Sequence, residues 1–153
     1  MKLRESITIR ARPEAIWVFL EDPDLMREWN PKLLDCEHIE GPKAGQGATY
    51  RACYRMGSKE MWCIQRLSDY DPPTSLGWHI TDPENDRLDG TRLRFTLKRT
   101  RQGIRVKQEI EFPDALIPTP VRWLIRLIMA VGKPQGELFL AKLKRTVEEV
   151  DKA

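Results

Sequence analysis

The sequence predicts an α+β fold in which a curved antiparallel sheet of about six to seven strands wraps around a long C-terminal helix, with two short helices after the first strand. Two features predict this architecture. From residue 33 to residue 112, apolar and polar residues alternate in short runs separated by turn residues, as in strands joined by hairpins. From residue 118 to residue 150, apolar residues recur at helical spacing instead. Hairpins make neighbouring strands antiparallel and leave one sheet face apolar, so the terminal helix is expected to cover that face.

The opening of the chain is expected to form a half-buried strand and then the two short helices. Apolar residues alternate with polar ones over residues 3–9. Pro13 suits the first position of a helix, where its missing N–H needs no partner. Asp22 is the expected N-cap of the second helix, which ends where Asn30 precedes Pro31.

The clearest alternation in the chain lies at residues 48–56. One side of this expected strand carries Ala48, Tyr50, Ala52, Tyr54 and Met56, and the other side carries Thr49, Arg51, Cys53 and Arg55. Residues 91–98 and 104–112 alternate in the same way. At 61–67 apolar residues occur on both sides, so the pattern leaves the inner face of that strand open. For residues 76–80, the expected inward side is the one that carries Trp78.

The terminal helix is expected to have two unlike halves. Residues 119–131 are apolar around nearly the whole circumference, apart from a narrow charged line that includes Arg122 and Arg126. Such a helix must be covered on several sides or must line an apolar space. The segment Gly132-Lys133-Pro134 is expected to break or kink it. Beyond the break, one apolar stripe of an amphipathic helix is formed by Leu140, Leu143, Val147 and Val150.

The bulk composition is that of a globular protein. The chain has 153 residues, 41% of them hydrophobic and 32% charged, which fits one domain with its own core and argues against disorder. A net charge of +3 is too small to predict nucleic-acid binding. No signal peptide or apolar run of about 20 residues is seen. The three cysteines have no paired spacing, which favours reduced thiols and a cytoplasmic location.

Several short motifs resemble those of a known superfamily. The run from Ile9 to Trp17 (IRARPEAIW), followed by Asp22-Pro23 and Trp29-Asn30-Pro31, resembles the opening of START and birch-pollen-allergen proteins, also called SRPBCC or polyketide cyclase-like proteins. Tyr70-Asp71-Pro72-Pro73 is similar to their turn before the fifth strand. The resemblance extends over essentially the whole chain, as one domain at 1–153, and implies a helix-grip fold.

The resemblance also implies a cavity between the sheet and the C-terminal helix. Members of the superfamily mostly hold apolar or amphipathic small molecules there, although some are cyclases and others transfer lipids. If the apolar sides of the strands and of the helix face this cavity, its walls are expected to contain Tyr50, Tyr54, Met56, Trp78, Phe95, Gln108, Ile110, Trp123, Leu124 and Leu127. The alternative is that the same residues pack as an ordinary core, with their polar atoms bonded to the backbone.

The first functional hypothesis is therefore a binding protein. Its expected ligand is a lipid, isoprenoid, quinone or polyketide-like molecule, which Tyr50, Tyr54 and Gln108 would orient while the apolar walls supply affinity. The second hypothesis is a cyclase or dehydratase in which His79 or a tyrosine transfers a proton. Alternation places His79 and Trp78 on opposite faces, so at most one of them reaches the cavity.

No metal site and no cofactor are predicted. Cys36, Glu37 and His38 are adjacent, but Cys53 and Cys63 supply no spaced ligand pair to complete a site. A glycine-rich turn at 45–47 lies between strands and opens no helix, so it is not a phosphate-binding loop.

The expected partner is the small molecule itself. Arg92, Arg94 and Lys98 share one strand face, but Glu109 and Glu111 interleave on the next strand, so a solvated face with ion pairs is favoured over nucleic-acid binding. An alternative is a transient membrane contact through the 119–131 helix, whose arginines lie beside apolar residues. The sequence leaves the identity of the ligand and the oligomeric state open.

Overall fold

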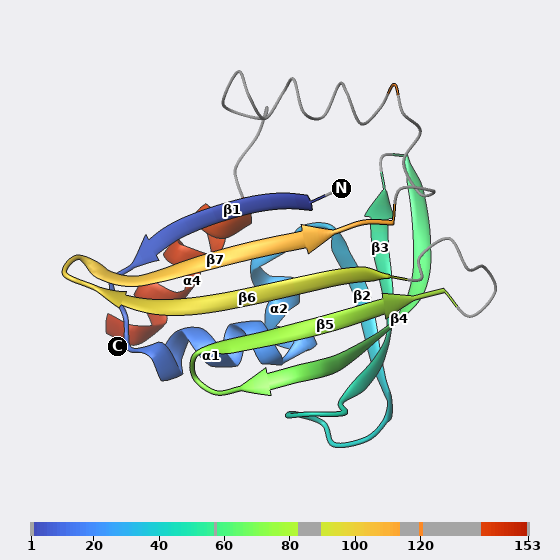
Figure 1. The fold of residues 1–153 in the computed structure, drawn as a ribbon, viewed down its shortest axis with the longest axis horizontal. Helices are drawn as coiled ribbons and strands as arrows, with labels where there is room; N and C mark the ends of the chain where they lie inside the picture. The colour runs from blue at the N-terminus through green and yellow to red at the C-terminus, as the bar shows by residue number, and fades with distance from the viewer. Residues whose placement is uncertain (1, 57, 83–89, 114–119, 121–138, 153) are drawn as a thin grey trace.

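The computed structural model describes residues 2–56, 58–82, 90–113, 120 and 139–152 (Figure 1). The helices and strands follow one another as β1 (Lys2–Ile9), α1 (Pro13–Glu21), α2 (Pro23–Trp29), β2 (Leu33–Glu40), β3 (Thr49–Met56), β4 (Lys59–Asp71), β5 (Ser75–Thr81), β6 (Thr91–Thr100), β7 (Gly103–Glu111) and α4 (Phe139–Lys152). The predicted order of one strand, two short helices and a run of strands is confirmed, as is a C-terminal helix. The predicted break at 132–134 lies outside the described residues.

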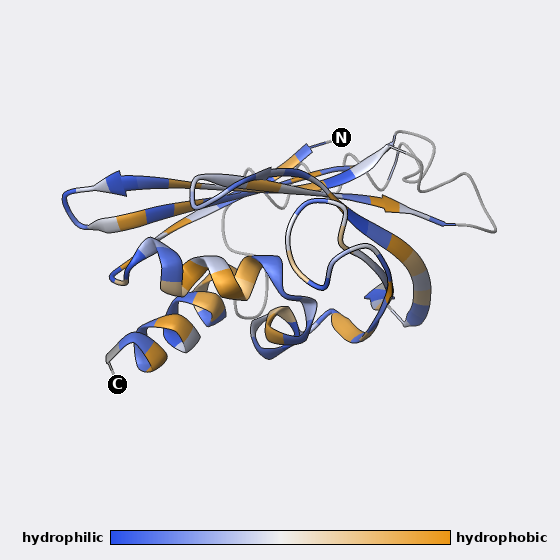
Figure 2. Ribbon diagram, turned by 90° about the horizontal axis from the view of Figure 1, so that it is seen from below, coloured by the Kyte–Doolittle hydropathy of each residue, from blue (hydrophilic) through white to orange (hydrophobic). Residues whose placement is uncertain are grey.

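All seven strands form one antiparallel sheet in the order β1-β7-β6-β5-β4-β3-β2. From β2 to β7, strands that follow one another in the sequence are neighbours in the sheet. The first strand, β1, is an edge strand and pairs with β7, with Lys2 opposite Glu111 and Ile9 opposite Ile104. Figure 2 shows α1, α2 and α4 on the same side of the sheet, whose β3–β4 end curves towards them. We call the face that carries these helices the concave face and the opposite face the convex face.

Local sequence explains where the short helices begin. Pro13 and Pro23 occupy the first turns of α1 and α2. Asp22 is the N-cap of α2, as predicted, because its side chain accepts a hydrogen bond from the Asp24 N–H at 3.0 Å. The backbone N–H of Asn30 donates to the Met26 carbonyl, which ends α2 before Pro31.

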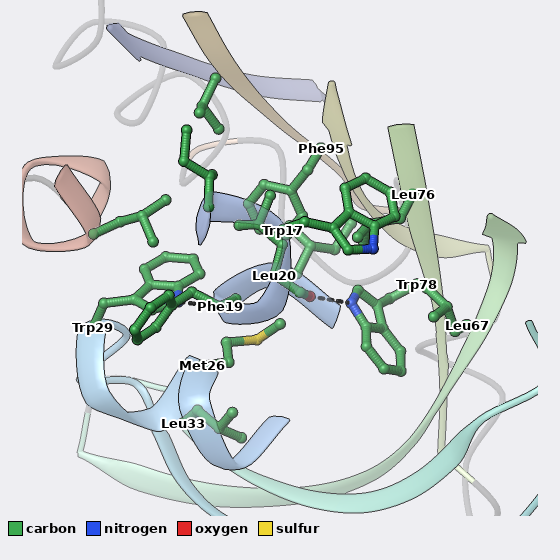
Figure 3. Close-up of a cluster of buried hydrophobic side chains, with 14 of the residues drawn as sticks. Trp17, Phe19, Leu20, Met26, Trp29, Leu33, Leu67, Leu76, Trp78 and Phe95 are labelled. Carbon is green, nitrogen blue, oxygen red and sulfur yellow. Dashed lines mark hydrogen bonds between the residues drawn. The ribbon is translucent and has the colours of Figure 1, made fainter. Parts of the chain in front are cut away.

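Two tryptophans anchor the helices to the concave face (Figure 3). The indole N–H of Trp78, on β5, donates to the Leu20 carbonyl of α1 at 3.3 Å. The indole N–H of Trp29, in α2, donates to the Phe19 carbonyl at 2.8 Å, and its ring meets the Phe95 ring edge-on at 5.9 Å. Each buried indole N–H therefore has a partner, so these aromatic residues add apolar contact without leaving a buried donor unpaired.

The described helix α4 packs beside β1, α1 and α2. Its apolar stripe of Leu140, Leu143 and Val147 is fully buried, as the periodicity predicts. Val150 was expected in the same stripe but is 57% exposed, and it lies in the last turn of the helix. Arg12 ties the C-terminal end of α4 to the start of α1 through an ion pair with Asp151 at 2.8 Å.

The structure also assigns the inner face of β4, which the sequence pattern left open. Cys63, Gln65 and Leu67 are buried on the concave face. Trp62 lies on the convex face, 41% exposed, with the Arg51 guanidinium 4.2 Å above its ring. This cation–π contact explains why an apolar side chain lies on the solvent side. Trp62 interrupts the alternation of apolar and polar residues, which is why the sequence pattern did not identify the inner face.

Candidate functional site

The concave face has a row of side chains that crosses strands β3, β4, β5 and β6. Strand register places Tyr50 opposite Gln65, Gln65 opposite Ile80, and Ile80 opposite Thr91. We call these four residues the Gln65 row. All four are buried, and two polar atoms of the row, Gln65 Nε2 and Thr91 Oγ1, have no hydrogen-bond partner among the described residues.

Gln65 is the centre of this row and is 0% exposed. Its Oε1 accepts a hydrogen bond from the Tyr54 hydroxyl of β3. Its Nε2 has no hydrogen-bond partner among the residues that the structure describes. Burial raises the pKa of Tyr54 above its usual value, so the phenol keeps its proton and remains the donor of this pair.

Tyr50 lies in the same row, but its polar atom is bonded within the protein. The hydroxyl donates to the Lys43 carbonyl in the loop before β3, and the ring meets His38 and Trp78 edge-on at 5.3 and 6.2 Å. Burial raises the pKa of Tyr50 to about 12. The hydroxyl is thus a neutral donor that fixes the position of the loop. That Tyr50 orients a ligand stays a prediction.

A second polar location lies at the β1–β7 end of the concave face. Glu5 of β1 stands opposite Gln108 of β7, and Glu5 accepts a hydrogen bond from the Leu140 N–H of α4 at 3.3 Å. Gln108 is only 6% exposed, and its Oε1 has no partner in the described part of the chain. Burial raises the pKa of Glu5, and the bond from Leu140 only partly opposes this shift.

Apolar residues separate the two polar locations. Leu93 lies opposite Ile110 on one side and Trp78 on the other, and Phe95 lies opposite Gln108. Trp78 and Phe95 contact the helices, as described above, whereas Ile110 is only partly buried. The concave face therefore presents an apolar strip with a polar group at either end.

Six of the predicted site residues lie on this face: Tyr50, Tyr54, Trp78, Phe95, Gln108 and Ile110. Trp123, Leu124, Leu127 and the side chain of Met56 lie outside the described residues. Glu5, Gln65 and Thr91 also belong to the two polar locations and were not predicted from the sequence. Glu5 alternates in phase with Leu3 and Ile7, so strict period-2 counting would have found it. Gln65 could not be placed on the concave face from the sequence, because the pattern at residues 61–67 did not show which face of that strand is buried.

His79 lies on the convex face, opposite Arg66 and Arg92, both of which are exposed. Its ring therefore points away from the apolar strip, and it cannot act on a molecule bound there. The Cys36 thiol, considered above as a possible metal ligand, donates a hydrogen bond to Asp24 at 3.3 Å. Within the described ranges, no group of three His, Cys, Asp or Glu side chains lies close enough to hold a metal ion.

The convex face is charged and shallowly hollowed. A depression of about 460 Å³ crosses β1, β6 and β7, and the side chains that line it on this face are those of Arg4, Ser6, Thr96, Lys98, Arg105 and Lys107. Arg4 pairs with Glu109 across the strands at 2.7 Å, which confirms the expected kind of cross-strand ion pair on this face. Among the described helices, none is long and apolar enough to cross a membrane.

Replacing Glu5 by glutamine is expected to increase stability at neutral pH and to have little effect under acid conditions. The pKa of Glu5 is raised in the folded state, so its contribution to stability is largest below the ordinary value of 4.5 and declines as the pH rises through the folded pKa. The side chain is half-exposed, so we expect a gain of less than about 1 kcal/mol at pH 7.

Urea unfolding of both proteins at pH about 4 and about 7 measures this difference. Glu37→Gln is the matched control, because Glu37 is exposed on β2. A Glu5→Gln protein whose stabilisation is larger at the lower pH would contradict the assignment.

The family model described as "Polyketide cyclase / dehydrase and lipid transport" matches residues 1–148. No curated protein matches the chain at a significant level of sequence similarity.

Solved structures with the same fold cover nearly the whole chain. TTHA0849 from Thermus thermophilus has a TM-score of 0.72 at 16% identity, covering 98% of this chain and 99% of that one. MLL2253 from Mesorhizobium loti has a TM-score of 0.66 at 19% identity, covering 99% of both chains. Major latex-like protein 151 from Panax ginseng has a TM-score of 0.66 at 14% identity, covering 100% of this chain and 98% of that one. These similarities confirm the expected helix-grip fold.

Proposed function

The chain belongs to the polyketide cyclase/dehydrase and lipid transport family, and from this premise we propose that it binds an apolar or amphipathic small molecule against the concave face. The ligand would lie between the sheet and the C-terminal helix and would belong to the lipid, isoprenoid, quinone or polyketide-like classes. The apolar strip around Leu93 and Ile110 would supply affinity at about 25 cal/mol for each Å² of apolar surface removed from water.

One observation carries this proposal. Three buried polar atoms on the concave face, Gln65 Nε2, Thr91 Oγ1 and Gln108 Oε1, have no hydrogen-bond partner among the described residues. A buried polar atom without a partner costs about 1–3 kcal/mol, so a face that served only as packing would be expected to carry apolar side chains at these positions. A bound molecule with a few polar groups would supply the missing partners.

Binding is better supported than proton transfer. His79 lies on the convex face, and burial raises the pKa of both Tyr50 and Tyr54, which keeps their hydroxyls neutral at physiological pH. A neutral phenol with a raised pKa is a hydrogen-bond donor and a poor general acid or base. The cyclase or dehydratase alternative therefore has no suitable group among the residues first considered for it.

Native mass spectrometry of gently purified protein, followed by solvent extraction, tests the proposal. We expect a bound apolar mass at one-to-one stoichiometry, or, in protein stripped of ligand, saturable binding of Nile red. Protein that carries no such mass and does not bind Nile red would contradict the proposal.

Tyr54→Phe connects binding to this face. Loss of the hydroxyl leaves Gln65 Oε1 unpaired and frees the amide to turn, so we expect Nile red affinity to change about threefold to tenfold while the protein stays folded. Tyr70→Phe is the matched control, because the Tyr70 hydroxyl donates to Glu21 at 2.6 Å, beside α1. A sharp fall in melting temperature with unchanged dye binding in Tyr54→Phe would make the tyrosine purely structural.

A further inference from the structure

The Gln65 amide has a fixed orientation. The Tyr54 hydroxyl donates to the amide oxygen, Gln65 Oε1, and burial raises the pKa of Tyr54, which keeps the proton on this donor. The amide nitrogen is then the free end, with two N–H groups and no partner in the described structure. An amide nitrogen donates only, so whatever satisfies it must present an acceptor.

Within the part of the chain that the structure describes, no neighbour of Gln65 bonds to its Nε2. Ile80 lies opposite it on β5 and has an apolar side chain. Tyr50 lies opposite on β3, where its hydroxyl donates to the Lys43 carbonyl. Cys63 is the next residue on the same face, and burial raises the pKa of its thiol to about 12, so it stays a weakly accepting thiol.

Thr91 extends the polar pattern along the row. It is 3% exposed, its Oγ1 has no partner among the described residues, and Ile80 separates it from Gln65. Two strand spacings put the Cα atoms of Gln65 and Thr91 about 10 Å apart. The row therefore presents a strict donor, an apolar side chain and a hydroxyl, an order that suits a rigid ring system with oxygen on it and not a bare hydrocarbon chain.

We propose that Gln65 selects for a carbonyl-bearing apolar ligand, whose carbonyl oxygen accepts a hydrogen bond from Gln65 Nε2 while its ring lies against Ile80. This inference rests on the proposed function and narrows it, since among the classes of ligand considered it favours ring ketones and quinones over saturated lipid chains. A site built to donate a hydrogen bond rejects analogues that lack the acceptor, because the buried donor is then left unpaired.

A pair of probes with the same skeleton tests the inference. Fluorenone carries one ketone, and fluorene is the corresponding hydrocarbon. Displacement of Nile red is measured for both probes with the wild-type protein, Gln65→Met and the control Gln102→Met, whose glutamine lies in the exposed β6–β7 turn. We expect the wild type to bind fluorenone about tenfold more tightly than fluorene, and Gln65→Met to lose this preference while still binding fluorene. Gln102→Met should retain it.

Two other outcomes are distinguishable. Equal affinities in the wild type, or a preference that survives in Gln65→Met, would overturn the inference and leave the proposed function standing, with water as the partner of the amide. Failure of both probes and of Nile red to bind would overturn both. If Gln65→Met does not fold because Tyr54 loses its acceptor, the double variant Tyr54→Phe/Gln65→Met removes both polar groups of the pair, and the same loss of preference is expected from it.

Discussion

Replacement of Phe95 by alanine is expected to lower the free energy of unfolding by about 3–5 kcal/mol. The Phe95 side chain is fully buried on β6, and its ring meets Trp29 of α2 edge-on at 5.9 Å. Alanine would remove this contact and leave a cavity between the sheet and α2 that the surrounding backbone cannot close, because β5 and β7 pair with β6 on both sides. Urea unfolding monitored by tryptophan fluorescence measures the loss.

The matched control is Arg94→Ala on the same strand. Arg94 is exposed on the convex face, so its replacement should change stability by no more than about 0.5 kcal/mol. Phe95 was predicted as part of the ligand-binding wall, and the experiment separates that role from packing. A Phe95→Ala protein of nearly wild-type stability that binds Nile red much more weakly would show that Phe95 contacts ligand more than it contacts α2.

The strands that the sequence predicts best are those with one clearly solvated face. In β3, β6 and β7, charged residues occupy the convex side, so alternation alone found the concave residues Tyr54, Phe95 and Gln108. Alternation is informative there because one face of the sheet is exposed to water and the other is buried against the helices. The capping of α2 by Asp22 could be predicted for a similar reason, since the cap needs only local backbone geometry.

The parts of the site that escaped prediction depend on contacts between distant residues. Gln65 was missed because Trp62, an apolar residue on the solvent side, hid which face of β4 is buried. The Trp62 ring is covered by the guanidinium of Arg51 from the neighbouring strand. Glu5 was missed although its alternation with Leu3 and Ile7 places it on the concave face. Its burial depends on α4, which is 135 residues away along the chain at Leu140. Neither of these distant partners, Arg51 of the neighbouring strand or Leu140 of α4, can be deduced from local periodicity.

Replacement of Thr91 by valine is expected to stabilise the ligand-free protein by about 1–2 kcal/mol. Valine has nearly the same shape, and the Thr91 hydroxyl is buried without a partner among the described residues, so the change removes a desolvation cost without opening a cavity. Both residues are β-branched and suit a strand, so the backbone contribution should be unchanged. Thermal and urea unfolding of the ligand-free protein measure the gain.

The control for this change lies in the same strand. Thr96→Val makes the identical substitution on the convex face, where Thr96 is partly exposed, and should change stability by no more than about 0.5 kcal/mol. If Thr91→Val instead destabilises the protein by more than about 1 kcal/mol, the hydroxyl has a partner in the folded protein and the polar pattern of the Gln65 row must be reinterpreted.

A stabilising Thr91→Val would have a consequence for function. Stability gained by deleting a buried polar group indicates that the group is retained for another purpose, since proteins commonly accept such costs at binding sites. We therefore expect Thr91→Val to combine a higher melting temperature with a weaker affinity for fluorenone, whereas Thr96→Val should change neither. Opposite signs of the two effects at one buried position would distinguish a binding face from a core that merely contains imperfectly packed polar residues.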